Sequence, residues 1–244
     1  MTYLSSNLTT VVNVVAVTRL ETGLGRFGFH GGDGRRLFLS RRAAGDHSIG
    51  SGLNGGVLDN HGGLIHAPGQ LLLTGLTQLD NRQGEISSDQ QFNLIGRTLD
   101  NTGGKLISNQ PLTVRVDQAI ANAKGLISGS GLTLSAASLD NREGLVSSRQ
   151  ALSLSVEGLL DNRQGTLVGD AASRLLAATL DNGQGTVSSK GSLIVQAGRM
   201  TNAGGSLVGL GQLELKGDYL DNRLLGLVGG NAAVLLDIVV FVRS

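Results

Sequence analysis

Residues 139–148 read LDNREGLVSS, and close copies stand at residues 79–88 (LDNRQGEISS) and 160–169 (LDNRQGTLVG). In each copy an apolar residue and an Asp precede an Asn. Counted over the whole chain, this Asn returns in steps of 21, 20, 21, 19, 21, 20, 20 and 20 residues, at Asn60, Asn81, Asn101, Asn122, Asn141, Asn162, Asn182, Asn202 and Asn222. A period of this length predicts a solenoid, in which one supersecondary unit is copied along an axis.

Other positions of the unit repeat with the Asn. An apolar residue stands five positions later, as at Val146, and a small residue seven positions later, as at Ser148. An alternating apolar pair follows, such as Leu152 and Leu154, and this period of two indicates a strand. Glycine stands three positions after the Asn in eight units, with Leu225 interrupting the column, at Gly63, Gly84, Gly104, Gly125, Gly144, Gly165, Gly185 and Gly205. Glycine there implies a turn with positive φ or a close approach of two backbones.

Each unit therefore has room for three short strands and three bends, and it is too short for a helix with its connections. A single unit buries too few apolar side chains to fold alone, so we expect its strands to pair in parallel with those of its neighbours. The predicted fold is all-β, a parallel β-helix of about nine coils and roughly 43 Å at about 4.8 Å per coil, with irregular flanks. We divide the chain into a non-repeat leader (1–51), disordered or acting as a cap, the repeats (52–229) and a non-repeat apolar tail (230–244). A leucine-rich repeat, the rival fold, is disfavoured because its Leu-x-x-Leu-x-Leu-x-x-Asn spacing is absent.

Stacking places identical residues of successive coils above one another. A column of Asn at a bend can then join its side-chain amides into a ladder, and Asn also tolerates a left-handed backbone. The Asp before it is less constant, because Ala121 and Thr201 replace it in two units. Constancy at Asn with variation at Asp favours a structural role over catalysis.

Composition excludes several classes of function. A formal net charge of +1 gives no general field for nucleic acid, and the chain has no Cys for a disulfide or a thiolate metal site. No positively charged segment precedes an apolar run near Met1, so no evident signal peptide is read from the sequence. The apolar stretch 224–242 contains Asn231 and Asp237, which disfavours a membrane span. We expect no cofactor, no nucleic acid and no small-molecule substrate.

The three quoted copies resemble the haemagglutinin repeat of filamentous haemagglutinin, which also occurs in exoproteins of two-partner secretion and in stick-like carriers of contact-dependent growth inhibition toxins. The resemblance covers about residues 52–229. It implies a right-handed β-helix, secretion through an outer-membrane two-partner-secretion transporter, and a place in the medium or on the surface of a Gram-negative bacterium. It also implies adhesion to glycans or receptors of host or bacterial cells as part of a larger protein. Nothing in Met1 to Ser51 resembles the family's secretion domain, and we do not expect residues 230–244 to form an effector domain.

Two groups of residues invite a chemical interpretation. The Asp column could bind a metal or act as acid and base, but such a site needs several oxygens converging from different strands. The column can instead be solvated, with part of its charge neutralised by the arginines directly after the Asn, namely Arg82, Arg142, Arg163 and Arg223. His61 and His66 share the first coil and could hold a metal, whereas single surface histidines, as we also expect for His30 and His47, are more common. We therefore predict no catalytic, cofactor or metal residues.

The surface offers two further candidates. Outward Ser87, Ser128, Ser147 and Ser188 could form a polar face for glycans, or could be ordinary strand positions. The Arg-rich part of the leader could bind phosphate polymers, or could simply be a poorly ordered segment. We expect a non-enzymatic adhesin segment, with a β-helical polysaccharide lyase or hydrolase, or a truncated remnant without independent activity, as alternatives.

Overall fold

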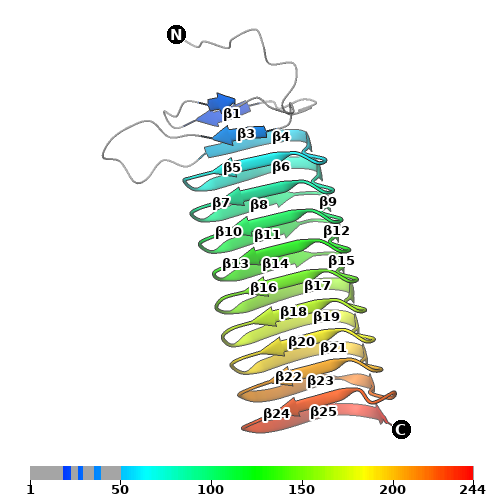
Figure 1. The fold of residues 1–244 in the computed structure, drawn as a ribbon. Helices are drawn as coiled ribbons and strands as arrows, with labels where there is room; N and C mark the ends of the chain where they lie inside the picture. The colour runs from blue at the N-terminus through cyan, green and yellow to red at the C-terminus, as the bar shows by residue number, and fades with distance from the viewer. Residues whose placement is uncertain (1–18, 23–26, 30–35, 40–50, 244) are drawn as a thin grey trace.

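The computed structural model describes residues 19–22, 27–29, 36–39 and 51–243, and these residues form strands and turns without a helix. Figure 1 shows the strands stacked as coils along one axis, with two sheets facing each other across the interior. The predicted parallel β-helix of about nine coils is confirmed. Since the described part of the chain has no helix, it contains none that could cross a membrane.

The first sheet carries one four-residue strand from each coil. Its strands follow one another in parallel, and each residue pairs with its counterpart one coil away, as Val146 pairs with Ile127 and with Leu167. These strands are β5 (Leu64–Ala67), β7 (Glu85–Ser88), β10 (Lys105–Ser108), β13 (Leu126–Gly129), β16 (Leu145–Ser148), β18 (Thr166–Gly169), β20 (Thr186–Ser189), β22 (Ser206–Gly209) and β24 (Leu227–Gly230).

The second sheet holds the rest of each coil. Three coils have the expected second and third strands as separate elements, namely β8 (Phe92–Gly96) with β9 (Leu99–Asp100), β11 (Leu112–Val116) with β12 (Ala119–Ala121), and β14 (Leu132–Ala136) with β15 (Ser138–Asp140). Elsewhere one continuous strand spans both parts: β4 (Ser51–Asp59), β6 (Leu71–Asp80), β17 (Leu152–Asp161), β19 (Ser173–Asp181), β21 (Leu193–Thr201), β23 (Gln212–Asp221) and β25 (Ala233–Val242). The third bend is then no more than a bulge, as at the register shift between Val156 and Leu159.

The core is a set of apolar columns that run the length of the stack. Alternation along β16 and β17 turns Val146, Leu152, Leu154 and Leu160 inward, and each of them is at most 1% exposed. Among residues 56–243, Phe92 is the largest side chain that is fully buried. Because the residue above and the residue below are of the same kind, each coil completes the core of its neighbours.

Described parts of both flanks pair with strands of the repeats. In the leader, β1 (Arg19–Thr22) pairs antiparallel with β4, β2 (Phe27–Phe29) pairs antiparallel with β3 (Arg36–Leu39), and β3 pairs in parallel with β5. In the tail, β25 continues the second sheet by pairing in register with β23, as Leu213 does with Val234. β25 in the tail is therefore part of a coil, and several of its apolar side chains are exposed.

Candidate functional site

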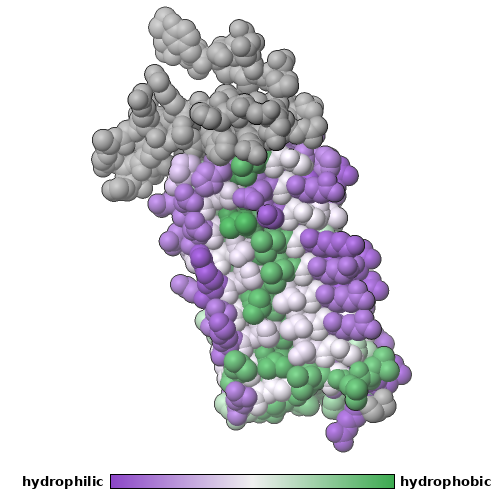
Figure 2. All heavy atoms as spheres, in the orientation of Figure 1, coloured by the Kyte–Doolittle hydropathy of each residue, from purple (hydrophilic) through white to green (hydrophobic). Residues whose placement is uncertain are grey.

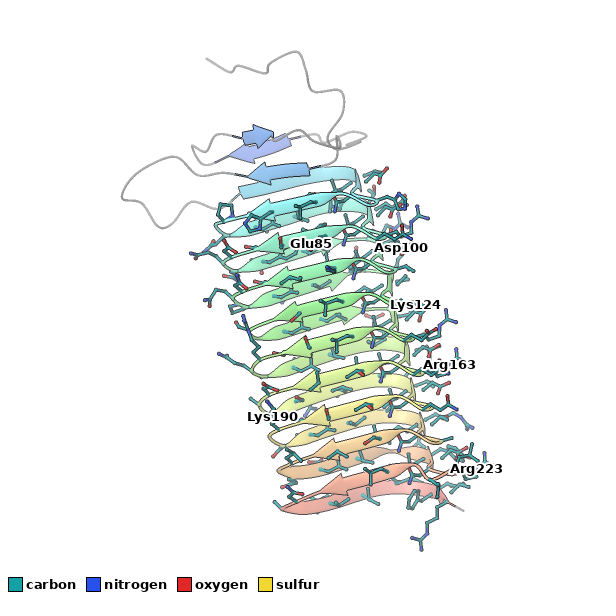
Figure 3. All side chains as sticks on the ribbon, in the orientation of Figure 1. Glu85, Asp100, Lys124, Arg163, Lys190 and Arg223 are labelled. Carbon is teal, nitrogen blue, oxygen red and sulfur yellow. The ribbon has the colours of Figure 1, made fainter. Side chains whose placement is uncertain are left out.

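The nine asparagines lie in one column at the corner where the second sheet passes into the first, and all of them are buried except the half-buried Asn222. The Nδ2 of each Asn donates to the Oδ1 of the next, at 2.7 Å over seven steps and 2.6 Å at the last, from Asn60 to Asn222. Asn81 to Asn202 are fully buried. Most of these amides also donate to backbone carbonyls, as Asn182 does to Gly185 at 3.2 Å and to Ser206 at 3.1 Å. Figure 3 shows this corner as one edge of the stack, with Lys124, Arg163 and Arg223 extending outward from it.

The turn around each Asn explains the glycine column. The backbone N–H of the Gly donates to the carbonyl of the Asn three residues before it, at 3.0 Å for Gly165 and Asn162. A Cβ on Gly165 would collide with the carbonyl oxygen of Asn141, one coil earlier, and would stand 2.7 Å from the Oδ1 of Asn162. The close approach is thus the reason for glycine.

Positive φ occurs one residue earlier than the sequence indicated. The residue two positions after the Asn takes a φ of 56° to 65°, at Gly62, Gln83, Gly103, Lys124, Glu143, Gln164, Gln184 and Gly204. Neither the Asn nor the repeated Gly adopts it. Three of these left-handed positions are glycines, and at the other five a long polar side chain is exposed to solvent.

The last coil has one more residue in this turn. Leu224 and Leu225 both have positive φ, and Gly226 takes the place of the repeated glycine, close to the carbonyl of Asn202. The apolar and small positions shift by one as well, so that Val228 pairs with Leu207 and Gly230 with Gly209. The interruption that the sequence places at Leu225 is therefore a one-residue insertion.

The Asp before each Asn has a local role that its position alone did not reveal. Its Oδ1 accepts the backbone N–H two residues later, at 2.9 to 3.2 Å, for Asp59, Asp80, Asp100, Asp140, Asp161, Asp181 and Asp221. This is an Asx turn, which satisfies a donor at the corner. Ala121 and Thr201 provide no carboxylate at this position, and those coils keep the ladder.

Arginines link this Asp column from coil to coil. Arg163 contacts Asp161 at 2.6 Å and Asp181 of the next coil at 3.6 Å, and Arg142 contacts Asp140 and Asp161 in the same way. The hydrogen bond from Arg142 lowers the pKa of Asp140, and those from Arg82 and Arg223 do the same to the pKa of Asp80 and Asp221. The hydrogen bond to Asp161 raises the pKa of Arg163 in return. The arginines thus neutralise part of the charge of the column.

A second corner, at the end of the first sheet, carries bonds that the sequence analysis missed. The small residues there include buried serines whose hydroxyls donate to backbone carbonyls, as Ser148 does to Ala151 at 2.8 Å and Ser189 to Ala171 at 2.5 Å. The repeated small residue seven positions after the Asn, which is often Ser, could have indicated these hydrogen bonds in the sequence. Figure 3 places Lys190 at this opposite edge.

The remaining candidates do not converge on one site. His66 lies 3.1 Å from the Ser87 hydroxyl and 3.7 Å from Asp89, and within the described residues no group of three or more His, Asp or Glu side chains could hold a metal. His30, His47 and most of the Arg-rich leader lie outside the described residues.

The four serines proposed as a polar face differ in their exposure. Ser87 is buried, whereas Ser128, Ser147 and Ser188 are half-buried, and the Ser147 hydroxyl donates to that of Ser128. Figure 2 shows a face whose hydrophilic side chains gather along its two edges.

The model of the haemagglutinin repeat matches this chain over residues 42–164, 132–194 and 156–234. The chain belongs to the haemagglutinin repeat family. No curated protein and no solved structure matches it. The matched range contains all nine ladder asparagines, so the corner described above is a feature of these haemagglutinin repeats. In this corner the amides bond to one another and to backbone carbonyls, and the carboxylates bond to backbone N–H groups and to arginines.

Proposed function

We propose that the chain is a non-enzymatic stretch of a secreted or surface-exposed filamentous adhesin of a Gram-negative bacterium, and that its solenoid is a rigid stalk. The observation that carries the proposal is the ladder, which runs without interruption from Asn60 to Asn222. Each step joins one coil to the next through a hydrogen bond between two side-chain amides, beside continuous apolar columns. A stack built in this way resists bending between repeats and holds attached parts at a fixed distance.

A patch of hydroxyls on the second sheet supports a role in contact with glycans. Thr113, Thr133 and Ser153 occupy one register position in successive coils, and Ser135 pairs with Ser155 beside them. Thr133, Ser153 and Ser155 are exposed, and the other two are half-buried. Uncharged hydroxyls repeated at the spacing of parallel strands can donate to and accept from the hydroxyls of a sugar chain.

Adhesion is tested with beads that carry the full chain, on cultured cells and on immobilised glycans. We expect beads with the wild-type chain to bind and a Thr133→Val/Ser153→Ala/Ser155→Ala variant to bind several-fold less. The matched control changes three hydroxyl residues in one register column of the opposite sheet, Thr166→Val/Thr186→Val/Ser206→Ala, and we expect it to bind as the wild type does. Equal binding by both variants would contradict this assignment of the surface.

Secretion through a two-partner transporter is the second part of the proposal. Its test is an immunoblot with antibody to residues 139–208 on cytosolic, surface and medium fractions of cells that produce the chain. We expect the signal at the surface or in the medium, and we expect it to move into the cell when the partner transporter is deleted. A signal confined to the cytosol in the presence of the transporter would exclude a surface stalk.

A further inference from the structure

One step of the ladder differs chemically from the others. Asn182 is followed by Gly183, and the chain has only one other Asn-Gly pair, Asn54-Gly55, which lies outside the ladder. Asparagine followed by glycine is the sequence most prone to deamidation. The glycine has no Cβ to hinder its backbone nitrogen from approaching the side-chain carbonyl carbon of the Asn.

In the folded stack, hydrogen bonds hold the Asn182 side-chain amide and the Gly183 N–H in positions from which they cannot react with each other. Asn182 is fully buried, its Oδ1 accepts from Asn162 at 2.7 Å, and its Nδ2 donates to Asn202 at 2.7 Å. The backbone N–H of Gly183 donates to the Oδ1 of Asp181 at 3.1 Å. The side-chain carbonyl carbon can turn toward that nitrogen only if the amide leaves the column and breaks these bonds.

We propose that Asn182-Gly183 is a deamidation site that the ladder gates. When this coil opens, the Gly183 nitrogen loses its proton to solvent base and forms a bond to the side-chain carbonyl carbon of Asn182. The bond from that carbon to Nδ2 breaks, and Nδ2 leaves as ammonia with a proton from water. A water molecule then opens the five-membered imide at one of its two carbonyls, which yields aspartate or isoaspartate without any oxidation.

The product cannot restore the ladder. A carboxylate only accepts hydrogen bonds, so the Oδ1 of Asn202 and the carbonyl of Ser206 lose the donor that Asn182 supplies. The carboxylate would also be buried as a charge without a cation in the column. Isoaspartate further lengthens the main chain by one carbon, which disturbs the pairing of β19 and β20 with their neighbours. A deamidation that occurs while the coil is open therefore leaves a permanent defect.

The chain offers a matched control for the glycine. Ala123 and Ala203 stand directly after ladder asparagines in their own coils, so the turn accepts a methyl group at this position. A Cβ at Gly183 would meet the Oδ1 of Asp181 at 3.3 Å as its nearest neighbour. Gly183→Ala should therefore keep the fold while it slows the attack of the nitrogen.

The experiment compares the full wild-type chain with Gly183→Ala at mildly alkaline pH, in native buffer and in urea. Trypsin releases residues 175–190, in which Asn182 is the only Asn, and mass spectrometry gives its deamidated fraction. We expect the wild type to deamidate at least about tenfold more slowly in native buffer than in urea, because only the open coil reacts. Gly183→Ala should react slowly in both. Equal wild-type rates in the two conditions, or no reaction of Asn182 in urea, would overturn the proposal.

A second measurement tests the consequence. Both proteins are incubated in urea, refolded, and melted by circular dichroism. We expect incubation to lower the melting temperature of the wild type more than that of Gly183→Ala, because both proteins keep the Asn54-Gly55 pair and differ only at residue 183. An unaltered melting temperature of wild type that is extensively deamidated at Asn182 would refute the claim that the product cannot re-enter the ladder.

Discussion

A buried asparagine is stable in this core because its polar atoms have partners. Asn141 accepts from Asn122, donates to Asn162, and also donates to the carbonyls of Gly144 and Thr166 at 3.3 Å. A buried polar group without a partner costs about 1 to 3 kcal/mol. The ladder therefore selects asparagine at each step, since no other side chain of this length carries both an acceptor and a two-proton donor.

The variant Asn141→Leu tests, at the middle of the ladder, whether the hydrogen bonds of the Asn side chain stabilise the fold. The change leaves the Nδ2 of Asn122 and the Oδ1 of Asn162 without their partners, and we expect a loss of about 3 kcal/mol in the free energy of unfolding. Urea unfolding followed by circular dichroism measures it. Asn93→Leu is the control, because Leu72 holds the same outward register position one coil earlier, and it should change stability by no more than about 0.5 kcal/mol. Similar stabilities of the two variants would refute the assigned role of the amide.

The Asp column predicts a response to acid. Arginine hydrogen bonds lower the pKa of Asp80, Asp140 and Asp221 in the folded chain below the ordinary value of 3.8. A carboxyl group with a depressed folded pKa stabilises the fold above its unfolded pKa, and this contribution is lost as the pH falls through the folded value. We expect the melting temperature to be nearly constant down to about pH 4 and then to fall.

The variant Asp80→Asn/Asp140→Asn/Asp221→Asn isolates this effect. Its amide oxygens can still accept the backbone N–H groups of Arg82, Arg142 and Arg223, but they carry no charge. The variant should melt at a lower temperature than the wild type at neutral pH and should lose less stability as the pH falls below about 4. Melting curves over this range measure it, and identical acid slopes would contradict the prediction.

At the scale of the element, the period identified the coil but not all of its bonds. Residues that recur every twenty positions must stack, so the Asn column, the apolar columns and the parallel pairing followed from the sequence. A repeated column shows where a side chain lies in the coil but not which group it bonds to. The Asx turn of Asp140 and the hydrogen bond from the Ser148 hydroxyl were therefore not predicted. The shift in the last coil was not predicted for a different reason, because positions counted at fixed offsets from Asn222 do not show an insertion at Leu225.

That insertion provides a prediction for the last turn. Leu224 and Leu225 are 73% and 93% exposed, and both hold a left-handed backbone that costs a residue with a Cβ about 1 to 2 kcal/mol. Leu225→Gly should therefore stabilise the last coil by about 1 kcal/mol. Hydrogen exchange of the β24 and β25 amides measures it, and slower exchange there with no change in β16 is the expected result. Unchanged or faster exchange of β24 would show that the turn is not strained.

At the scale of the whole molecule, the coil is the unit that can be added or removed. Deletion of residues 162–181 joins Asp161 to Asn182 and removes one complete coil, after which the strands of β17 and β21 can pair as β17 and β19 do now. Deletion of residues 172–181 removes only half a coil and brings Asn162 and Asn182 into one turn of the solenoid, so the columns on either side no longer meet. We expect the first variant to fold into a rod shorter by about 4.8 Å, and the second to lose the pairing on one side of the deletion. Far-UV circular dichroism and small-angle X-ray scattering measure both. Equal behaviour of the two deletions would mean that the stack is held by something other than register between coils, and the rigid-stalk proposal would lose its physical basis.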